Sequence, residues 1–282
     1  MDSKVPKSKR ICISVDGSQY SDYAFDLIFN ELYRPKDYIL LTHIYNSSKL
    51  SSIPFTYQPD TIISKYSTKL LTKIPQDYYS VRKEDRVKKD EHALSYVLEI
   101  AKKSNIDILV VGFKGYKPKN DSQLFSSGVG YLIKNNIFPT LVVKQNIKRS
   151  EKKNQKFNWL FSIEDTSSLS FKAFKFAIQF FDKKNDVVLG YHIDNRHFKD
   201  EIEKEFKSIC QKEGIENTQF IVEKKVSGLS IGKQISKFVN ETNGTDVDFV
   251  IMGNNPGKHP QLQECPLGEV LNNALANVLF LK

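Results

Sequence analysis

One pattern constrains the fold of this chain more than any other: a hydrophobic run that ends in glycine and is followed by hydroxyl residues. The run DILVVGFKG covers 107–115, and Ser126 and Ser127 follow eleven and twelve residues later. A strand that leads through glycines to a helix beginning with serine is typical of parallel sheets that bind phosphate through backbone amides. A second run, DFVIMGNNPG at 248–257, has the same strand and exit glycine with a different loop. The chain is therefore predicted to contain two copies of one unit.

The length and composition favour two soluble domains. The chain has 282 residues, 40% of them hydrophobic, which suffices for a sizeable core and for about two domains of ~140 residues. No apolar stretch approaches the ~18 residues of a membrane helix, and the basic first ten residues precede no hydrophobic segment. We expect no membrane insertion and a cytoplasmic location, either free or within a cytoskeletal or organellar complex.

The three cysteines are odd in number and far apart, which argues against a disulfide framework or a zinc site. Cys12 lies in an apolar run and is predicted to be in the core. No flanking residue indicates that Cys210 or Cys265 is reactive.

The positive charge is concentrated in the first half of the chain. Of the net charge of +9, +8 falls in residues 1–148 and +1 in residues 149–282. Much of the excess lies in the N-terminal tail and in RKEDRVKK at 82–89, where acidic residues are interspersed. This pattern favours a solvated helix face over a nucleic-acid groove, so nucleic acid is not an expected partner.

Hydrophobic periodicity predicts alternating strands and helices. In the first half, strands are predicted at 10–15, 38–45, 78–81, 106–111 and 141–143, and helices at 20–32, 61–74, 93–101 and 127–135. In the second half, strands are predicted at 159–163, 187–192, 219–222, 249–252 and 278–281, and helices from about 170, at 199–212 and at 231–242. The charged segment NIKRSEKKNQK at 146–156 lacks a hydrophobic period, which predicts domains 1–148 and 157–282 joined by a linker at 149–156.

The alternation of strands and helices indicates an α/β fold. Right-handed crossovers place the parallel strands in one sheet with helices on both faces. Single positions also repeat between the halves: Asp16 and Asp165 follow the first strands, and Gly112 and Gly253 end the fourth. The sequence therefore predicts two doubly wound parallel-sheet domains.

Candidate ligand-binding residues lie at the carboxyl ends of the predicted strands, where doubly wound sheets bind their ligands. The carboxylate of Asp16 can accept hydrogen bonds from a ribose or an adenine amine; alternatively, Asp16 only starts a turn and caps the first helix. His43 and Ile44 are near the end of the second strand, where their backbone is expected to meet a base. Val111 holds the corresponding place in the fourth strand.

The loop after the fourth strand is the predicted phosphate site. Gly112 and Gly115 let the backbone approach a phosphate, and Lys114 between them adds charge. Ser126 and Ser127 offer hydroxyl and amide donors at the start of the next helix. G-x-x-G alone often marks only a tight turn, but the strand before it, the helix after it and the upstream aspartate make the set more specific.

With these residues the chain resembles a tandem universal stress protein, two copies of that family's domain covering nearly all of the sequence. The family opens with a strand followed by D-x-S, as at 16–18, and its ATP-binding members carry G-x2-G-x9-G-[ST] before a helix and a proline-led last strand. Gly112 and Gly115 match the first two glycines, and residues 139–143 match the last strand. The resemblance implies a Rossmann-like, adenine nucleotide alpha-hydrolase-like fold with ATP, with or without Mg²⁺, as the ligand.

The third glycine of that pattern is missing. Counting back from Pro139 places Ser126 at the glycine and Ser127 at the hydroxyl residue, whereas counting forward from Gly115 gives Phe125 and Ser126. A serine can still present its amide to a phosphate, but a phenylalanine would hinder it.

The second domain departs further from the family pattern. Its second glycine arrives one residue late, at Gly257, and the only later candidate pair is Gly268 and Glu269. A carboxylate would repel a phosphate there, so ATP is expected in the first domain only. The resemblance also implies that the domains pair through their last strands, 141–143 and 278–281, as a pseudo-dimer inside one chain.

No motif of a known catalytic mechanism accompanies these loops. The five histidines form no HExxH set, and there is no P-loop and no G-x-S-x-G elbow, so neither a metal site nor a catalytic residue is predicted. Hydrolysis of ATP should be slow at most. Two functions stay open: an ATP-binding stress-response regulator whose loop at 114–127 changes the surface that an unidentified protein partner meets, and a non-catalytic scaffold of a larger assembly.

Overall fold

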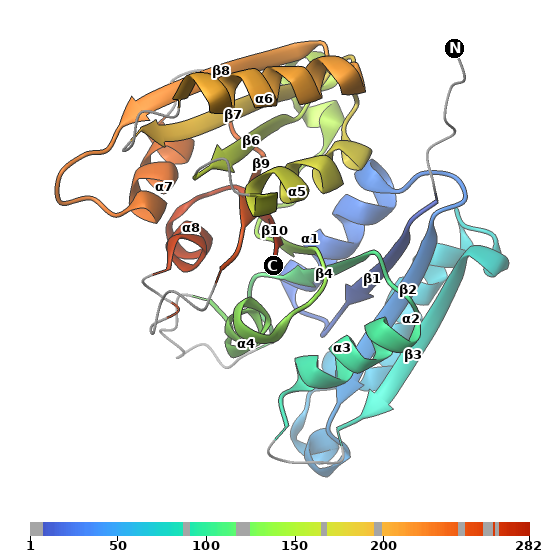
Figure 1. Ribbon diagram of the computed structural model, residues 1–282. Coiled ribbons are helices and arrows are strands. Elements are labelled where there is room, and N and C mark those ends of the chain that lie inside the picture. Colours follow the sequence, from blue (N-terminus) through green and yellow to red (C-terminus); the bar gives the residue numbers. More distant parts are fainter. Residues whose placement is uncertain are drawn as a thin grey trace. The chain divides into compact units, whose positions relative to one another are not determined.

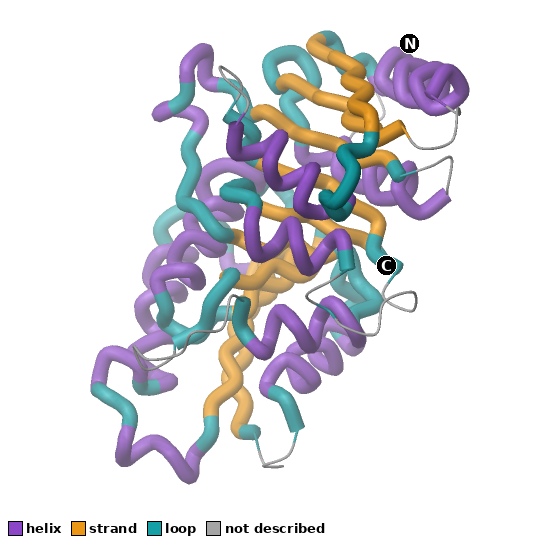
Figure 2. Tube along the Cα trace, turned by 90° about the vertical axis from the view of Figure 1, so that its left-hand side faces the viewer, coloured by secondary structure: helices purple, strands orange, loops and turns teal. Residues whose placement is uncertain are grey.

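The computed structural model describes residues 8–86, 91–116, 125–164, 168–194, 199–241, 246–255, 262 and 265–282. The chain divides into two compact units, Met1–Asn146 and Ile147–Lys282 (Figure 1). In each unit the strands lie between helices (Figure 2), as the alternating sequence pattern predicts.

The described part of the first unit contains five strands and four α-helices. The strands are β1 Arg10–Ser14, β2 Tyr38–Tyr45, β3 Tyr79–Asp85, β4 Ile108–Gly112 and β5 Thr140–Val143. The helices are α1 Gln19–Leu27, α2 Pro59–Leu71, α3 Ala93–Lys103 and α4 Ser127–Asn135. A π-helical turn at Ile28–Leu32 extends α1, and short 3₁₀ turns lie at Ser47–Ser52, Phe55–Tyr57 and Gln76–Tyr78.

Short polar side chains fix where the helices of the first unit begin. The hydroxyl of Ser18 accepts a hydrogen bond from the amide of Ser21 at 3.2 Å and thereby caps α1. Ser126 caps α4 in the same way, by accepting from the amide of Val129 at 3.2 Å. Both helices therefore begin directly after the loops that follow β1 and β4.

The strands of the first unit form a parallel sheet in the order β3-β2-β1-β4-β5. From β1 the chain moves outward through β2 to β3 and then returns to β4 on the other side of β1. Because crossovers are right-handed, this reversal places α1 and α2 on one face and α3 and α4 on the other. Ion pairs of Asp22 with Lys65 and of Asp26 with Lys69 join α1 to α2. The order reverses between β1 and β4, where open α/β sheets bind ligands.

The second unit repeats this order. Its strands are β6 Asn158–Ile163, β7 Val187–Asp194, β8 Asn217–Lys224, β9 Phe249–Gly253 and β10 Asn277–Leu281, and they are arranged as β8-β7-β6-β9-β10, all parallel. Its helices are α5 Ser168–Ala177, α6 Lys199–Glu213, α7 Ile231–Glu241 and α8 Pro266–Asn273, and 3₁₀ turns lie at Arg149–Glu151, Lys153–Gln155 and Ile178–Phe180. The prediction of two doubly wound α/β units is confirmed.

The two cores are filled differently. In the first unit β1 and β4 supply fully buried aliphatic residues such as Ile11 and Leu109. In the second unit aromatic rings dominate: Trp159 stacks on Phe249 with ring centroids 3.8 Å apart, and Phe161 stacks on Phe174 at 4.5 Å. The larger rings give the second unit an interior with more aromatic contacts.

The segment after β5 is anchored on the second unit. Arg149 forms a bidentate ion pair with the buried carboxylate of Asp186, and the ammonium group of Lys152 lies 2.7 Å from Asp248. Two charges of this segment are therefore engaged with specific carboxylates of the second unit.

Most predicted elements are found within one or two residues of their predicted bounds. Two elements differ from the prediction. Strand β3 extends to Asp85, four residues beyond its predicted end, and helix α8 is not predicted by the sequence pattern. No residue of β3 is buried, and its second half is charged, so it carries little hydrophobic signal. Pro266, Gly268 and Glu269 interrupt the hydrophobic pattern of α8. All three cysteines are buried, as predicted for Cys12, and burial raises the pKa of Cys12 and of Cys210 to about 12.

Candidate functional site

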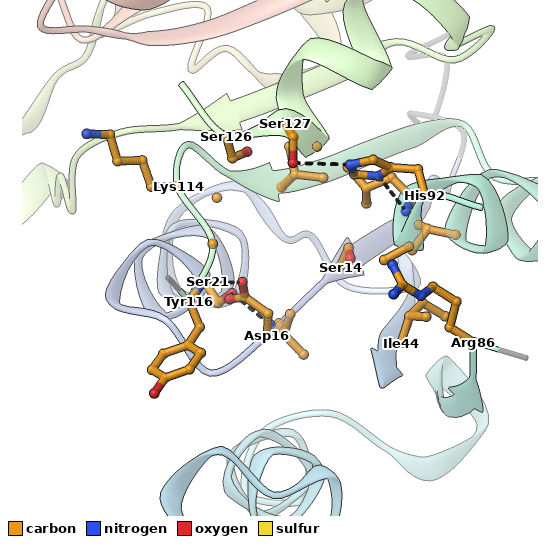
Figure 3. Close-up of a pocket in the computed structure, with 18 residues that line it drawn as sticks. Ser14, Asp16, Ser21, Ile44, Arg86, His92, Lys114, Tyr116, Ser126 and Ser127 are labelled. Atoms are coloured by element: carbon orange, nitrogen blue, oxygen red, sulfur yellow. Dashed lines mark hydrogen bonds between the residues drawn. The ribbon is translucent and has the colours of Figure 1, made fainter. Parts of the chain in front are cut away.

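A cavity of about 300 Å³ lies at the carboxyl ends of β1 and β4 in the first unit (Figure 3). Its position is the point where the strand order reverses, which is the position that the fold itself favours for a ligand. Eight of the nine residues predicted to bind the ligand line it: Asp16, Ile44, Val111, Gly112, Lys114, Gly115, Ser126 and Ser127. The volume is at the lower end of the range for small-molecule sites.

Asp16 holds the two loops of the cavity together. One oxygen of its carboxylate accepts hydrogen bonds from the amide of Ser18 at 3.0 Å and the hydroxyl of Ser21 at 2.6 Å. The other oxygen accepts from the amide of Tyr116 at 2.8 Å, which ties the loop after β1 to the loop after β4. Asp16 therefore starts the turn, as one alternative had it, while Ser18 caps the helix.

Both glycines of the predicted phosphate loop are required by packing within the protein. A β-carbon on Gly112 would lie 2.7 Å from the backbone carbon of Tyr20, so β4 can end this close to α1 only without a side chain. A β-carbon on Gly115 would lie 2.6 Å from a carboxylate oxygen of Asp16. The G-x-x-G spacing thus has a structural explanation that does not need a phosphate.

The starts of α3 and α4 form one wall of the cavity. The imidazole Nδ1 of His92 accepts a hydrogen bond from the amide of Leu94 at 3.3 Å and caps α3. Its Nε2 lies 3.3 Å from the hydroxyl of Ser127, and its ring stacks on Tyr131 with centroids 5.0 Å apart. Burial, and then the charge of Arg86, lowers the pKa of His92. A neutral His92 with its proton on Nε2 donates to Ser127.

Arg86 is the main residue that the sequence did not identify. It follows β3 directly, and its amide donates to the carbonyl of Tyr45 at 2.7 Å, which extends the β2–β3 ladder. In Figure 3 Arg86 and His92 lie on the side of the cavity opposite Asp16 and Tyr116. Because β3 was predicted to end at Val81, Arg86 was not placed at a strand end; the correct end of β3 would have indicated it.

Lys114 contributes less than its position in the loop suggested. It lines the cavity, but its ammonium group points away from Asp16 and His92 (Figure 3) and lies 5.9 Å from the centroid of the Phe113 ring. Its carbonyl accepts a hydrogen bond from the hydroxyl of Ser18 at 3.2 Å. The backbone of Lys114 therefore helps to fix the loop, and its charge is turned away from Asp16 and His92.

His43 does not line the cavity. Its side chain is buried, and its Nδ1 lies 2.8 Å from the carbonyl oxygen of Val15. Burial is the main reason that the pKa of His43 is lowered. His192 of the second unit is buried in the same way, with its Nδ1 2.9 Å from the carbonyl of Ile163. Both histidines link the first two strands of their units, so the His43 side chain is engaged within the sheet.

The corresponding region of the second unit is packed differently. A β-carbon on Gly232, in the first turn of α7, would lie 2.5 Å from the carbonyl oxygen of Pro266 at the start of α8. The hydroxyl of Ser230 lies 2.7 Å from each carboxylate oxygen of Glu269, a residue with only 7% of its surface exposed. Asp165 and Gly257, which the sequence comparison singled out, lie outside the described residues.

Neither a membrane-spanning helix nor a metal-binding cluster occurs among the described residues. No helix there combines the length and the apolar character that a bilayer requires. No three histidine, cysteine, aspartate or glutamate side chains of the described segments gather as a metal site would need.

Residues 7–144 match the model of the Universal stress protein family. No protein with a curated description matches the chain. Among solved structures, a universal stress protein from Archaeoglobus fulgidus DSM 4304 is 16% identical and covers 98% of this chain and 99% of that chain, with a TM-score of 0.66. A functionally unknown protein from Pseudomonas aeruginosa PAO1 is 12% identical and covers 98% of this chain and 93% of that chain, with a TM-score of 0.61. These two likenesses extend over both units and establish the fold.

A universal stress protein family protein from Arabidopsis thaliana with AMP bound is 15% identical and covers 51% of this chain and 96% of that chain, with a TM-score of 0.35.

Proposed function

We propose that the chain is a tandem universal stress protein whose first unit binds an adenine nucleotide and acts as a regulatory module. The observation that carries the proposal is the cavity at the β1–β4 reversal, in a segment whose sequence matches the family. Its walls combine the carboxylate of Asp16, the side chains of Arg86 and His92, and the serine-capped start of α4. A nucleotide has complementary groups: hydroxyls and an amine that donate, and a phosphate that accepts.

Little or no hydrolysis is expected of this site. Asp16 is the one carboxylate among the described residues that line the cavity, and three donors already engage its oxygens. A carboxylate bonded in this way is a weak base and a poor ligand for Mg²⁺, so any Mg²⁺ would be held chiefly by the nucleotide. Positioning without a general base gives slow phosphoryl transfer, which suits a regulator better than an enzyme.

We further propose that only the first unit binds the nucleotide. In the second unit, the backbone of α7 lies against the start of α8 at Gly232 and Pro266. The carboxylate of Glu269 lies at the same place, bonded to Ser230. Its negative charge would repel a phosphate brought to this helix start.

Calorimetry with AMP, ADP and ATP on the full chain tests the proposal. We expect one nucleotide per chain and, in freshly purified protein, the release of adenine nucleotide on denaturation. Ser127→Asp should weaken binding about tenfold or more, because it places a carboxylate in the cavity. An aspartate in the first turn also suits the helix dipole, so α4 should still form.

The matched control is Gln19→Asp, which adds the same charge at the first position of α1, where Gln19 is exposed and does not line the cavity. Equal losses in both variants would point to a general charge effect. If the unmodified chain binds no nucleotide at millimolar concentration, the proposal is wrong, and the scaffold function is favoured instead.

A further inference from the structure

We propose that β8, the edge strand of the second unit, pairs with β8 of a second copy of this chain, antiparallel and centred on Phe220. Such pairing joins two chains through their second units and does not depend on the nucleotide site. β8 is the last strand of its sheet (Figure 1), so its outer backbone groups bond to no further strand among the described residues. An edge of this kind is a template for another strand unless charged residues or proline protect it.

β8 is held in place along its whole length. All eight of its residues pair with β7, and the amide of Glu216 extends the ladder by donating to the carbonyl of Lys183 at 3.0 Å. At the other end, the side-chain amide of Gln234 donates to the carbonyl of Lys224 at 2.9 Å. The strand is therefore ordered before a partner arrives, which lowers the entropic cost of pairing.

The edge strand of the first unit, β3, is protected where β8 is not. Ile221 and Val222 of β8 correspond to Arg82 and Lys83 of β3, because Lys83 and Val222 each pair with the histidine of the second strand. Arg82 and Lys83 are exposed, and two copies of β3 would bring these like charges together. β8 has aliphatic residues there, and residues 149–282 carry a net charge of only +1.

The apolar side chains of the β8 edge are only partly covered. The ring of Phe220 lies over Gly190 of β7 and has its centroid 5.7 Å from that of Phe206 in α6, yet Phe220 is only half-buried. Ile221 and Val222 are half-buried as well. A further strand at this edge would remove more of their apolar surface from water, which favours pairing.

Pairing centred on Phe220 makes one face of β8 complementary to itself. A two-fold axis perpendicular to the sheet keeps every side chain on its face and brings residues of the same face opposite each other. Phe220 then lies opposite Phe220 of the second copy, and Thr218 lies opposite Val222. Glu216 lies opposite Lys224, which gives two pairs of opposite charge. Aromatic, β-branched and oppositely charged pairs are each favourable across antiparallel strands.

The charged residues at the two ends select this register. Glu216 and Lys224 are exposed, and neither forms an ion pair with another residue that the structure describes. A shift by two residues in one direction would place Lys224 opposite Thr218, and a shift in the other would place Glu216 opposite Val222. Both shifts remove the ion pairs, so the charges favour the pairing centred on Phe220.

Sedimentation velocity and light scattering on the full chain test the proposal. We expect a monomer at about 1 μM and a growing dimer fraction towards about 500 μM, because a single strand pair buries little surface. Lys224→Glu should weaken dimerisation about fivefold or more, since it creates two like-charge pairs with Glu216. Glu216→Lys should have the same effect, and the double variant that exchanges both charges should restore the affinity of the unmodified chain.

Lys233→Glu is the control, because it makes the same change of charge at an exposed residue of α7. It should leave dimerisation unchanged, and the fluorescence of Trp159 should show that every variant is folded. A chain that is monomeric at all concentrations overturns the inference and leaves the edge to an extended peptide of another protein. A dimer that the single reversals do not weaken, or that the double variant does not restore, also overturns it.

Discussion

In both units the third and fourth helices begin next to each other, but the contact between their starts is built differently. In the first unit, side chains make it: His92 at the start of α3 reaches Ser127 at the start of α4. In the second unit, the backbone at Gly232 in α7 comes close to the carbonyl of Pro266 in α8. A contact through side chains leaves the two helix starts farther apart than a contact through backbone. The cavity of the first unit lies beside its two helix starts.

The residue that follows the third strand also differs between the two units. His43 pairs with Lys83 in the first sheet, and His192 pairs with Val222 in the second, so Arg86 corresponds to Lys225. Arg86 is partly buried and lines the cavity, whereas Lys225 is exposed. Equivalent positions in one fold thus carry a cation turned inward in one unit and a solvated one in the other.

What the two units share lies at the opposite ends of the strands. Asp37 and Asp186 directly precede the second strand of their units and accept hydrogen bonds from the residue before the first strand, from Lys9 at 2.8 Å and from Phe157 at 3.0 Å. Both carboxylates are almost fully buried. The comparison indicates that the two units share the contacts at the amino ends of their strands and differ at the carboxyl ends, where this fold binds ligands.

The largest expected effect is that of replacing the buried aspartate that precedes the second strand, which both units share. Asp186→Asn should lower the free energy of unfolding of the second unit by about 3 kcal/mol, because it leaves the partly buried Arg149 without its carboxylate. Asp186 also accepts from the Trp159 indole at 3.0 Å, so urea unfolding followed by the fluorescence of this single tryptophan reports the change. Asp246→Asn is the control: Asp246 is 89% exposed, and its loss should cost at most about 0.5 kcal/mol. If both variants lowered the free energy of unfolding equally, the stabilising role of the buried aspartate would be contradicted.

A smaller effect should separate the two glycines that end the fourth strands. Gly112→Ala places a methyl group 2.7 Å from the backbone of Tyr20 and should cost about 2–3 kcal/mol. Gly253→Ala meets the side chain of Leu169 at 3.1 Å and the backbone nitrogen of Ser170 at 3.3 Å, which is less close than at Gly112, and should cost about 1 kcal/mol. Chemical unfolding of the two variants, followed by circular dichroism, measures the difference. A larger cost at Gly253 would show that the two strand ends are not packed as described.

The smallest effect concerns the side-chain contact at His92. Because its pKa is lowered in the folded chain, the unfolded chain binds more protons as the pH falls through about 6.5, and stability decreases in that range. His92→Asn keeps a capping side chain but cannot titrate. The difference in unfolding free energy between the unmodified chain and this variant should therefore decrease from pH 7.5 to pH 5.5, whereas His43 contributes equally to both. A difference that stays constant over this range would contradict a neutral His92.

The sequence by itself predicted the strand–helix order, the doubly wound fold and eight of the eighteen residues that line the cavity. Hydrophobic periodicity and capping serines are local signals, so β2 and α4 have the bounds predicted for them. The parallel arrangement then brings strand ends together wherever those ends are correctly placed, as it does for Asp16 and Gly112.

Only the tertiary structure decided what each of these residues does. Gly115 faces the carboxylate of Asp16, His43 bonds to the backbone of Val15, and Arg86 enters the cavity from an exposed strand whose sequence carries little hydrophobic signal. Each of these contacts joins residues far apart in the chain. Local residue patterns specify the elements of this protein, but the partner of a buried polar group depends on which strand ends and helix starts the packing brings together.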